Sequence, residues 1–166
     1  EMGRGVRDAF DMLGNAVLQL GEIEDENGET VILTHANFQS LLQSYDRRVR
    51  QDAFNTYYKA YESHQYTYST LLAGSIKKDL FYSRAKKFSS YRAKALFSEN
   101  IPVEVYDNLL DSVHQSLDPL YKYFDLRKRL LELDELHMYD CNVPLVKDMN
   151  WHMPFEQAVE EIKSAL

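Results

Sequence analysis

A long, proline-free helical pattern is the feature that most limits the fold of this chain. Apolar and aromatic residues recur every three or four positions from residue 49 to residue 80, which is the spacing of one helix face. The members of this face are Val49, Ala53, Tyr57, Tyr61, His64, Tyr68, Leu71, Ile76 and Leu80. At 3.6 residues per turn, the pattern predicts one helix of about nine turns. Gly74 lies within it and either weakens the helix or allows close packing.

The same periodicity covers most of the remaining chain, so the sequence predicts an all-α fold made of one domain. The expected elements are a helix over 1–21 that ends at Gly21, a hairpin over 22–33, helices over 34–99 that include the long one, helices over 102–133, a loop or short strand over 137–147 and a helix over 154–166. Pro119 predicts a kink in the 102–133 region because proline has no N–H to donate to the helix.

The hairpin is the single β element that we expect. Asn27-Gly28 favours a type I′ turn, in which both central residues have positive φ, and β-branched and apolar residues follow from Thr30 to Leu33. An isolated two-stranded hairpin is marginally stable in water. We therefore expect its edge to pair with, or pack against, another part of the protein.

Composition excludes several classes of function. A net charge of −7 argues against nucleic acid as a main partner, because phosphate binding needs a concentrated positive surface. No apolar run approaches the roughly 18 residues that would span a membrane. The single cysteine, Cys141, permits no intrachain disulfide and suits a reducing compartment such as the cytoplasm. Cys141 is either a small buried side chain or a nucleophile, and no basic partner lies near it in the sequence to activate it.

A search for catalytic motifs finds no complete set. The five histidines, His35, His64, His114, His137 and His152, include no pair one helical turn apart, so the zinc motif His-Glu-x-x-His is absent. Glycine-rich phosphate loops and Gly-x-Ser-x-Gly are also absent. We expect no catalytic, cofactor-binding or metal-binding residue in this chain.

The sequence leaves two roles open, that of Asp140 and that of the tyrosines on the long helical face. Asp140 follows Tyr139 in a non-helical, apolar segment, where it either caps or orients a neighbour or lines a site. The tyrosines of the long helical face either pack against other helices or line a wet groove, because a tyrosine ring can pack while its hydroxyl stays solvated.

Several sequence patches, in order, resemble oligoendopeptidase F, a cytoplasmic zinc metallopeptidase related to thimet oligopeptidase. The patches are Leu33-Thr34-His35-Ala36-Asn37-Phe38, the run from Ser44 to Phe54 with Tyr57, Tyr58 and Tyr61 after it, Ser90 to Leu96, Asn100-Ile101-Pro102 with Val105 to Leu110, and Leu136 to Asp140 with Pro144-Leu145-Val146. They cover almost the whole chain, and their order makes the resemblance more specific than any single patch.

This resemblance implies a large helical enzyme around a deep channel that admits short peptides. One zinc ion is held by a His-Glu-x-x-His helix and a further glutamate, and the motif glutamate activates a zinc-bound water. None of these residues is in this chain, because in the family they lie downstream of the matched segment. The resemblance therefore implies an internal segment that binds no zinc itself, in agreement with chain ends that look cut through helices.

Within such an enzyme, we expect the segment to supply channel wall and scaffold. The hairpin around Asn27-Gly28 and the residues Tyr139 and Asp140 are the candidates for surfaces that face the peptide. The alternative is that both pack against the remaining parts of the enzyme. Expected partners are oligopeptide substrates, the rest of the enzyme, or a second copy bound through exposed apolar faces. A free-standing helical interaction module is the other reading, and it predicts polar faces all round.

Overall fold

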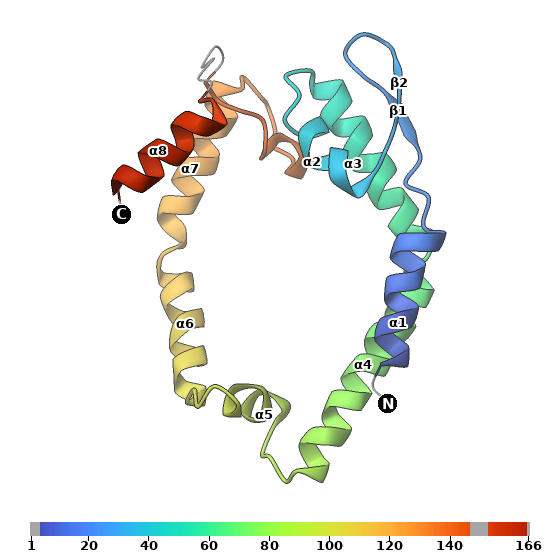
Figure 1. Cartoon of the computed structure of the whole chain (residues 1–166), viewed down its shortest axis with the longest axis vertical. Coiled ribbons are helices and arrows are strands. Elements are labelled where there is room, and N and C mark those ends of the chain that lie inside the picture. The colour runs from blue at the N-terminus through green and yellow to red at the C-terminus, as the bar shows by residue number, and fades with distance from the viewer. Residues whose placement is uncertain (1–3, 147–152, 166) are drawn as a thin grey trace.

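The computed structural model describes residues 4–146 and 153–165, and these are mainly helical with one small β-hairpin, as the sequence predicts (Figure 1). The elements are α1 (Gly5–Met12), β1 (Glu22–Glu24), β2 (Thr30–Ile32), α2 (His35–Leu41), α3 (Arg47–Glu62), α4 (Gln65–Ala85), α5 (Tyr91–Phe97), α6 (Val103–Gln115), α7 (Leu117–Leu130) and α8 (Phe155–Ala165). A π-helical stretch over Leu13–Val17 follows α1, and a short 3₁₀ turn covers Met138–Asp140.

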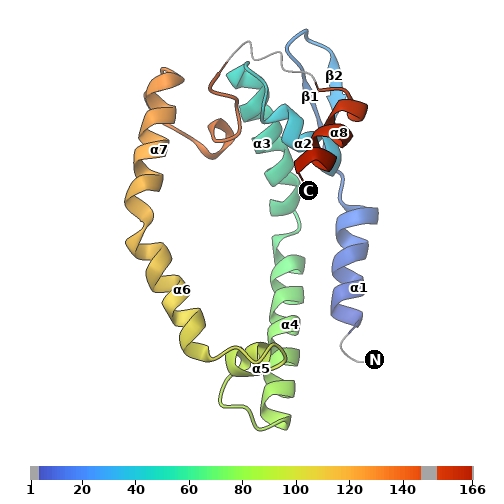
Figure 2. The ribbon, with the colours of Figure 1, turned by 60° about the vertical axis from the view of Figure 1, so that its left-hand side comes forward.

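The helices form an open frame with two arms. The α3–α4 arm, with α1 packed alongside α4, makes one side, and the α6–α7 arm makes the other (Figures 1 and 2). Helix α5 joins the arms at one end, where it contacts both α4 and α6. At the other end, the 3₁₀ turn over Met138–Asp140 contacts α3 and closes the frame.

The expected nine-turn helix is wrong in one respect, because it is divided into α3 and α4. Backbone angles at His64, φ −112° and ψ 15°, interrupt it. The Ser63 hydroxyl donates a hydrogen bond to the Ala60 carbonyl at 2.7 Å and contacts His64 Nδ1 at 2.8 Å. Such side-chain bonds to nearby groups compete with the helical backbone pattern. Helix α4 follows α3 with a clear change of direction, so this side of the structure is bent where the two helices meet (Figure 1).

The hairpin turn also differs from its prediction. Of the two turn residues only Gly28 has a positive φ, 81°, so the turn is not type I′. The backbone pair that closes the turn is Asp25 with Glu29, in which the Asp25 N–H donates to the Glu29 carbonyl at 2.9 Å. Asp25 Oδ1 accepts from the N–H groups of Glu29 at 2.9 Å and Asn27 at 2.8 Å, which folds a longer loop. These bonds, that from Glu29 foremost, lower the pKa of Asp25.

The first helix ends well before Gly21, contrary to the prediction of a helix over residues 1–21. The backbone becomes extended at Leu18, and Gly21 adopts φ +85° as the chain turns into β1. A Cβ at Gly21 would lie 2.9 Å from Thr56 Cγ2, so the chain passes very close to α3 here. Burial of Leu20 beside α3 favours this extended path over a further helical turn.

Two further sequence features have clear structural counterparts. Helices α6 and α7 are separated at Ser116, where φ is −105° and ψ is 16°, and Pro119 lies in the first turn of α7. An N–H there would lack a helical partner anyway, so proline is tolerated. Gly74 allows close packing, since a Cβ at this position would lie 3.3 Å from Val6 Cγ2 of α1.

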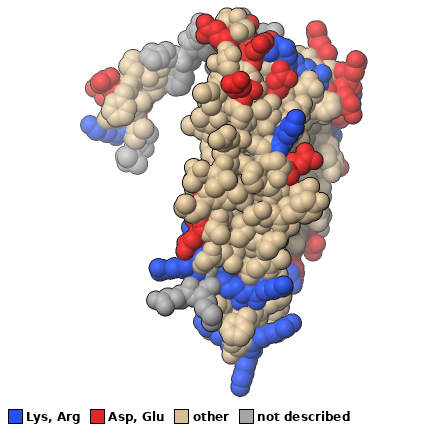
Figure 3. Space-filling model, turned by 90° about the vertical axis from the view of Figure 1, so that its right-hand side faces the viewer, with Lys and Arg blue, Asp and Glu red and all other residues tan. Residues whose placement is uncertain are grey.

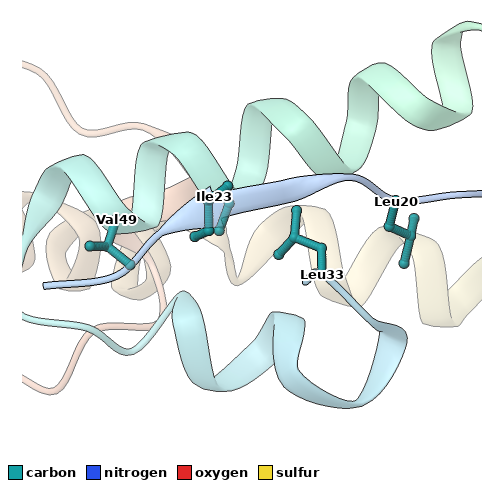
Figure 4. Close-up of a cluster of buried hydrophobic side chains, with 5 residues drawn as sticks. Leu20, Ile23, Leu33 and Val49 are labelled. Atoms are coloured by element: carbon teal, nitrogen blue, oxygen red, sulfur yellow. The ribbon is translucent and has the colours of Figure 1, made fainter. Parts of the chain in front are cut away.

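A small buried cluster fixes the hairpin against α3. It contains Leu20, Ile23, Leu33, Val49 and Ala53, of which Val49 and Ala53 are completely buried. Figure 4 labels four side chains of this cluster: Ile23 from β1, Leu20 and Leu33 from the residues that flank the two strands, and Val49 from α3. The hairpin therefore packs against another element, as its marginal stability alone requires.

Large apolar side chains remain exposed on both arms. On α4, Leu72 is 63% exposed, and on α6, Leu109 is 58% exposed. The set on these arms also includes Ile76, Leu80, Phe81, Val105, Val113, Leu120, Tyr121 and Leu130. Figure 3 shows a broad uncharged area on the α1–α4 side, between acidic side chains at the hairpin end and basic ones at the opposite end. A free-standing module with polar faces all round does not fit this surface. No helix in the described residues is long and apolar enough to cross a membrane.

Candidate functional site

The most constrained polar group in the described residues is the carboxylate of Asp140, which is fully buried. Arg47 donates two hydrogen bonds to it, from Nε to Oδ1 at 3.2 Å and from Nη2 to Oδ2 at 2.9 Å. Arg50 Nη2 donates to Oδ1 at 2.8 Å, and the backbone N–H of His137 donates to Oδ2 at 3.1 Å. Each carboxylate oxygen therefore accepts two hydrogen bonds, and three of these four bonds come from charged guanidinium groups.

Local sequence explains how α3 presents these two arginines. Arg47 and Arg50 are three positions apart, so they lie on one face of the first turn of α3. Asp46 caps that helix, since its side chain accepts from the Arg48 N–H at 2.9 Å. Arg50 is 3% exposed, and it also donates to the Ser44 carbonyl at 2.8 Å.

A third arginine reaches the same segment from α7. Arg127 is 4% exposed, and its Nη2 donates to the carbonyls of Asp140 at 2.9 Å and Val143 at 2.6 Å. Its Nη1 donates to the Tyr123 hydroxyl at 3.0 Å. Asp140, Arg47, Arg50 and Arg127 thus form a unit that ties α3, α7 and residues 137–143 together, and we call it the Asp140 clamp.

Burial and charge act in opposite directions on Asp140. Burial alone would raise the pKa of this carboxyl, because it penalises the charged form. Hydrogen bonds from Arg47 and Arg50 outweigh that effect and hold the pKa below its ordinary value. The same contact with Asp140 raises the pKa of Arg47. Asp140 is therefore an ionised anchor at neutral pH and not a proton donor.

Tyr139 packs beside the clamp and is 6% exposed. Its ring lies under the Arg47 guanidinium, 5.4 Å from the ring centre, and meets Phe54 of α3 edge-on at 5.9 Å. The His137 ring stacks on the Tyr139 ring, with ring centres 5.0 Å apart. The prediction that Tyr139 and Asp140 line a peptide channel stays a prediction. Their contacts are those of a structural junction, including the capping bond from His137 that the sequence left open.

A second polar group links the tyrosine face of α3 to α2. The Tyr57 hydroxyl lies 2.9 Å from His35 Nδ1 and 3.5 Å from the Tyr61 hydroxyl. Phe38 of α2 stacks on the Tyr57 ring with centres 3.8 Å apart. Burial, followed by the bond to Tyr61, raises the pKa of Tyr57 far above 10.0. In this part of the chain the tyrosines serve helix packing, one of the two roles that the sequence left open.

The remaining candidates form no reactive group. Within residues 4–146 and 153–165, no three histidine, cysteine or acidic side chains gather closely enough to hold a metal ion. Cys141 is partly exposed, and burial raises the pKa of its thiol, which disfavours a nucleophilic thiolate. His152, one of the five histidines, lies outside the described residues.

The arginines of the clamp are the residues that sequence reasoning missed. Arg50 and Arg127 are buried, although both lie in runs of charged residues. A usable signal is the position of Arg50 between Val49 and Ala53 on an apolar helix face. A charged residue at such a position requires a buried partner.

Comparison with known proteins identifies the family. Residues 40–166 match the profile of peptidase family M3, which is more than half of the chain. The chain belongs to peptidase family M3. Among curated M3-like relatives, oligopeptidase PepF of Bacillus subtilis is 43% identical over 157 residues, which are 95% of this chain and 23% of that protein. Group B oligopeptidase PepB of Streptococcus agalactiae is 36% identical over 159 residues, 96% of this chain and 26% of that protein.

Solved structures agree with this assignment to peptidase family M3. Oligoendopeptidase-F from Enterococcus faecium superposes with a TM-score of 0.87 at 39% identity, covering 99% of this chain and 31% of that one. A putative peptidase from Chlamydophila abortus gives a TM-score of 0.87 at 32% identity, covering 99% and 27%. The chain therefore spans about a quarter of the length of the curated M3 relatives that it matches.

Proposed function

We propose that this chain is a segment of a zinc metalloendopeptidase that hydrolyses short oligopeptides, and that it supplies channel wall and scaffold. The observation that carries this proposal is the similarity over 99% of the chain to an oligoendopeptidase-F of about three times its length. The open frame with exposed apolar arms supports it further, because such surfaces are stable only when something covers them.

Zinc enters the proposal only for the complete enzyme. The described residues gather no metal-binding cluster, and the sequence has no His-Glu-x-x-His motif, so the donors present do not fit a zinc site. We therefore assign no zinc ligand and no catalytic group to this chain. The zinc ligands of the proposed enzyme belong to its remaining three quarters.

The hairpin is the proposed contact with the peptide backbone. In the described residues the sheet has two strands only, with β1 lying against α3, so the outer edge of β2 has no strand beside it. An extended peptide can add to such an edge through backbone hydrogen bonds. The exposure of Ile32 on β2, 70%, supports an accessible surface here. Tyr139 and Asp140 would then serve the channel by supporting its wall from within.

The proposed partners and cellular location also follow from the surface and the composition of the chain. The exposed arms contact the rest of the enzyme, and in the isolated chain they favour self-association. We also propose a cytoplasmic enzyme, because one cysteine in 166 residues suits a reducing compartment. The acidic net charge of −7 disfavours a nucleic-acid partner.

Peptide hydrolysis by two proteins tests the proposal. The first is a full-length enzyme that contains this segment, and the second is the 166-residue chain alone, each assayed with a short quenched fluorescent peptide and zinc. We expect hydrolysis by the full-length enzyme, its loss with a chelator and its recovery with zinc, and no hydrolysis by the chain. An inert full-length enzyme would refute the peptidase assignment, whereas activity of the chain alone would refute its scaffold role.

A further inference from the structure

The two arms of the frame meet at two junctions in the described part of the chain. At one junction, α5 bridges α4 and α6, and at the other the Asp140 clamp joins α3 to the segment that follows α7. Between these junctions, α4 does not pack along α6 or α7 (Figures 1 and 2). The separation of the arms therefore depends on what happens at their two ends.

The two junctions differ greatly in their electrostatic environment. The α5–α6 junction contains an ion pair between Arg92 and Asp107 at 2.7 Å, whose side chains are 45% and 50% exposed. Exposed pairs of this kind contribute little, because water and salt screen them. The pair of Arg50 and Asp140 at 2.8 Å is 4% and 0% exposed, so it is screened much less.

We propose that Asp140 is a positioning residue, which holds the α3–α4 and α6–α7 arms at a fixed separation and so determines how tightly the frame binds a peptide. This inference rests on the proposed function as a channel wall. The two-bond grip of Arg47 restricts rotation about the contact as well as distance, which a single bond does not. Without the clamp, the ring contact of Tyr139 with Phe54 and the bond from Gln39 to Asn142 Oδ1 at 3.1 Å remain at this end, and neither fixes the orientation of the two arms as the bidentate contact of Arg47 does.

The expected kinetic effect is on substrate binding. The chain has no zinc motif, so a change in arm separation alters contacts with the peptide more than the chemical step. Losing contacts made equally in the ground state and the transition state raises KM and leaves kcat unchanged. A general loss of folded enzyme would instead lower the apparent kcat and leave KM unchanged.

The test uses the full-length enzyme with Asp140→Asn and Arg47→Gln. Arg47 is 40% exposed, so its variant keeps the buried Arg50 pair and folds even where Asp140→Asn does not. We expect KM to rise by about tenfold for Asp140→Asn and less for Arg47→Gln, with kcat within about twofold of the parent. Asp107→Asn, which breaks the exposed pair at the other junction, is the matched control and should leave KM unchanged.

A distance measurement gives an independent readout. Spin labels at Lys77→Cys on α4 and Lys122→Cys on α7, in a full-length enzyme with Cys141→Ser and no other reactive cysteine, report the arm separation. The distance distribution should broaden with Asp140→Asn and stay narrow with Asp107→Asn. An active parent enzyme whose KM is unchanged by both clamp variants would overturn this inference and leave the proposed function standing. An inactive parent enzyme would instead overturn the proposed function, and with it the channel on which this inference rests.

Discussion

Asp140 accepts a hydrogen bond from Arg50 Nη2 at 2.8 Å although the two residues are 90 positions apart in the sequence. Both are buried, and the contact joins the start of one arm to the end of the other. A buried ion pair gains little over a well-packed apolar pair, but removing one partner leaves an uncompensated charge. The pair is therefore a point at which small chemical changes have large consequences for the frame.

The clamp predicts a loss of stability in acid. The folded-state pKa of Asp140 lies below its ordinary value of 3.8, so folding favours the ionised form. Its contribution is fully present above pH 3.8, the value expected in the unfolded chain, and it is lost as the pH falls through the lower folded value. Chemical denaturation of the chain at a series of pH values should show this decline.

Asp140→Asn identifies how much of the acid sensitivity comes from this one group. The free energy of unfolding of this variant at neutral pH should be about 3 kcal/mol lower than that of the parent, because Arg50 keeps its charge and loses the carboxylate that pairs with it. Its stability should also fall less in acid than that of the parent. Equal acid sensitivity in the two proteins would show that other carboxylates govern it, with Asp107→Asn as the exposed control.

Two glycines with positive φ predict different costs for alanine. At Gly21, an added Cβ would lie 2.9 Å from Thr56 Cγ2, whereas nothing lies within 4 Å at Gly28. Gly28→Ala should cost about 1–2 kcal/mol of unfolding free energy from its backbone conformation, and Gly21→Ala about 3 kcal/mol because a clash is added. Thermal and urea unfolding measure both.

A second substitution separates strain from steric overlap at this site. Thr56→Ser removes the Cγ2 atom that the new Cβ would meet, so the double variant Gly21→Ala/Thr56→Ser should recover part of the lost stability. Thr56→Ser in Gly28→Ala is the control and should bring no recovery. A double variant no more stable than Gly21→Ala would show that the whole loss of unfolding free energy comes from the backbone conformation at residue 21.

Local signals were sufficient for much of the fold. The positions of helix starts at Thr34, Asp46 and Ser90 follow from side chains that cap the next backbone N–H groups, and these bonds span two or three residues. The interruption near His64 was not predictable in the same way. It depends on Ser63 bonding to the Ala60 carbonyl, and serine within a helical pattern has no single outcome.

The clamp could not be derived from sequence patterns for a related reason. Asp140 is unusual in the sequence because it follows Tyr139 in a non-helical segment, but its partners lie in a helix about 90 residues earlier. Periodicity reports which side of a helix is apolar and carries no information on what meets that side. The sequence alone therefore does not name Asp140 as the partner of Arg47 and Arg50, which only the path of the chain brings together.

The cap of α2 predicts a modest and specific effect. Thr34 Oγ1 accepts from the Asn37 N–H at 3.1 Å, and Asn37 Oδ1 accepts from the Thr34 N–H at 2.8 Å. Thr34→Ala should lower the free energy of unfolding by about 1 kcal/mol, because one helix N–H loses its acceptor. Thr34→Ser keeps the hydroxyl and should be close to the parent in urea unfolding. Equal losses in the two variants would instead assign the effect to the threonine methyl group.

Tyr57 predicts a late step in the alkaline titration of the tyrosines. Burial and the contact with Tyr61 raise its pKa above 10.0, so this phenol stays protonated when an unfolded tyrosine would ionise. The sign of the linkage follows: the stabilisation is complete below pH 10.0 and declines as the pH rises toward the higher folded value. Tyr57→Phe should reduce the amplitude of the late phase in the ultraviolet absorbance titration, leaving the part due to Tyr68, whose pKa burial also raises, and it should cost about 1 kcal/mol through the lost contact with His35. Tyr66→Phe, at a position that is 81% exposed, is the matched control, and a late phase that disappears in that variant would assign the titration to the wrong tyrosine.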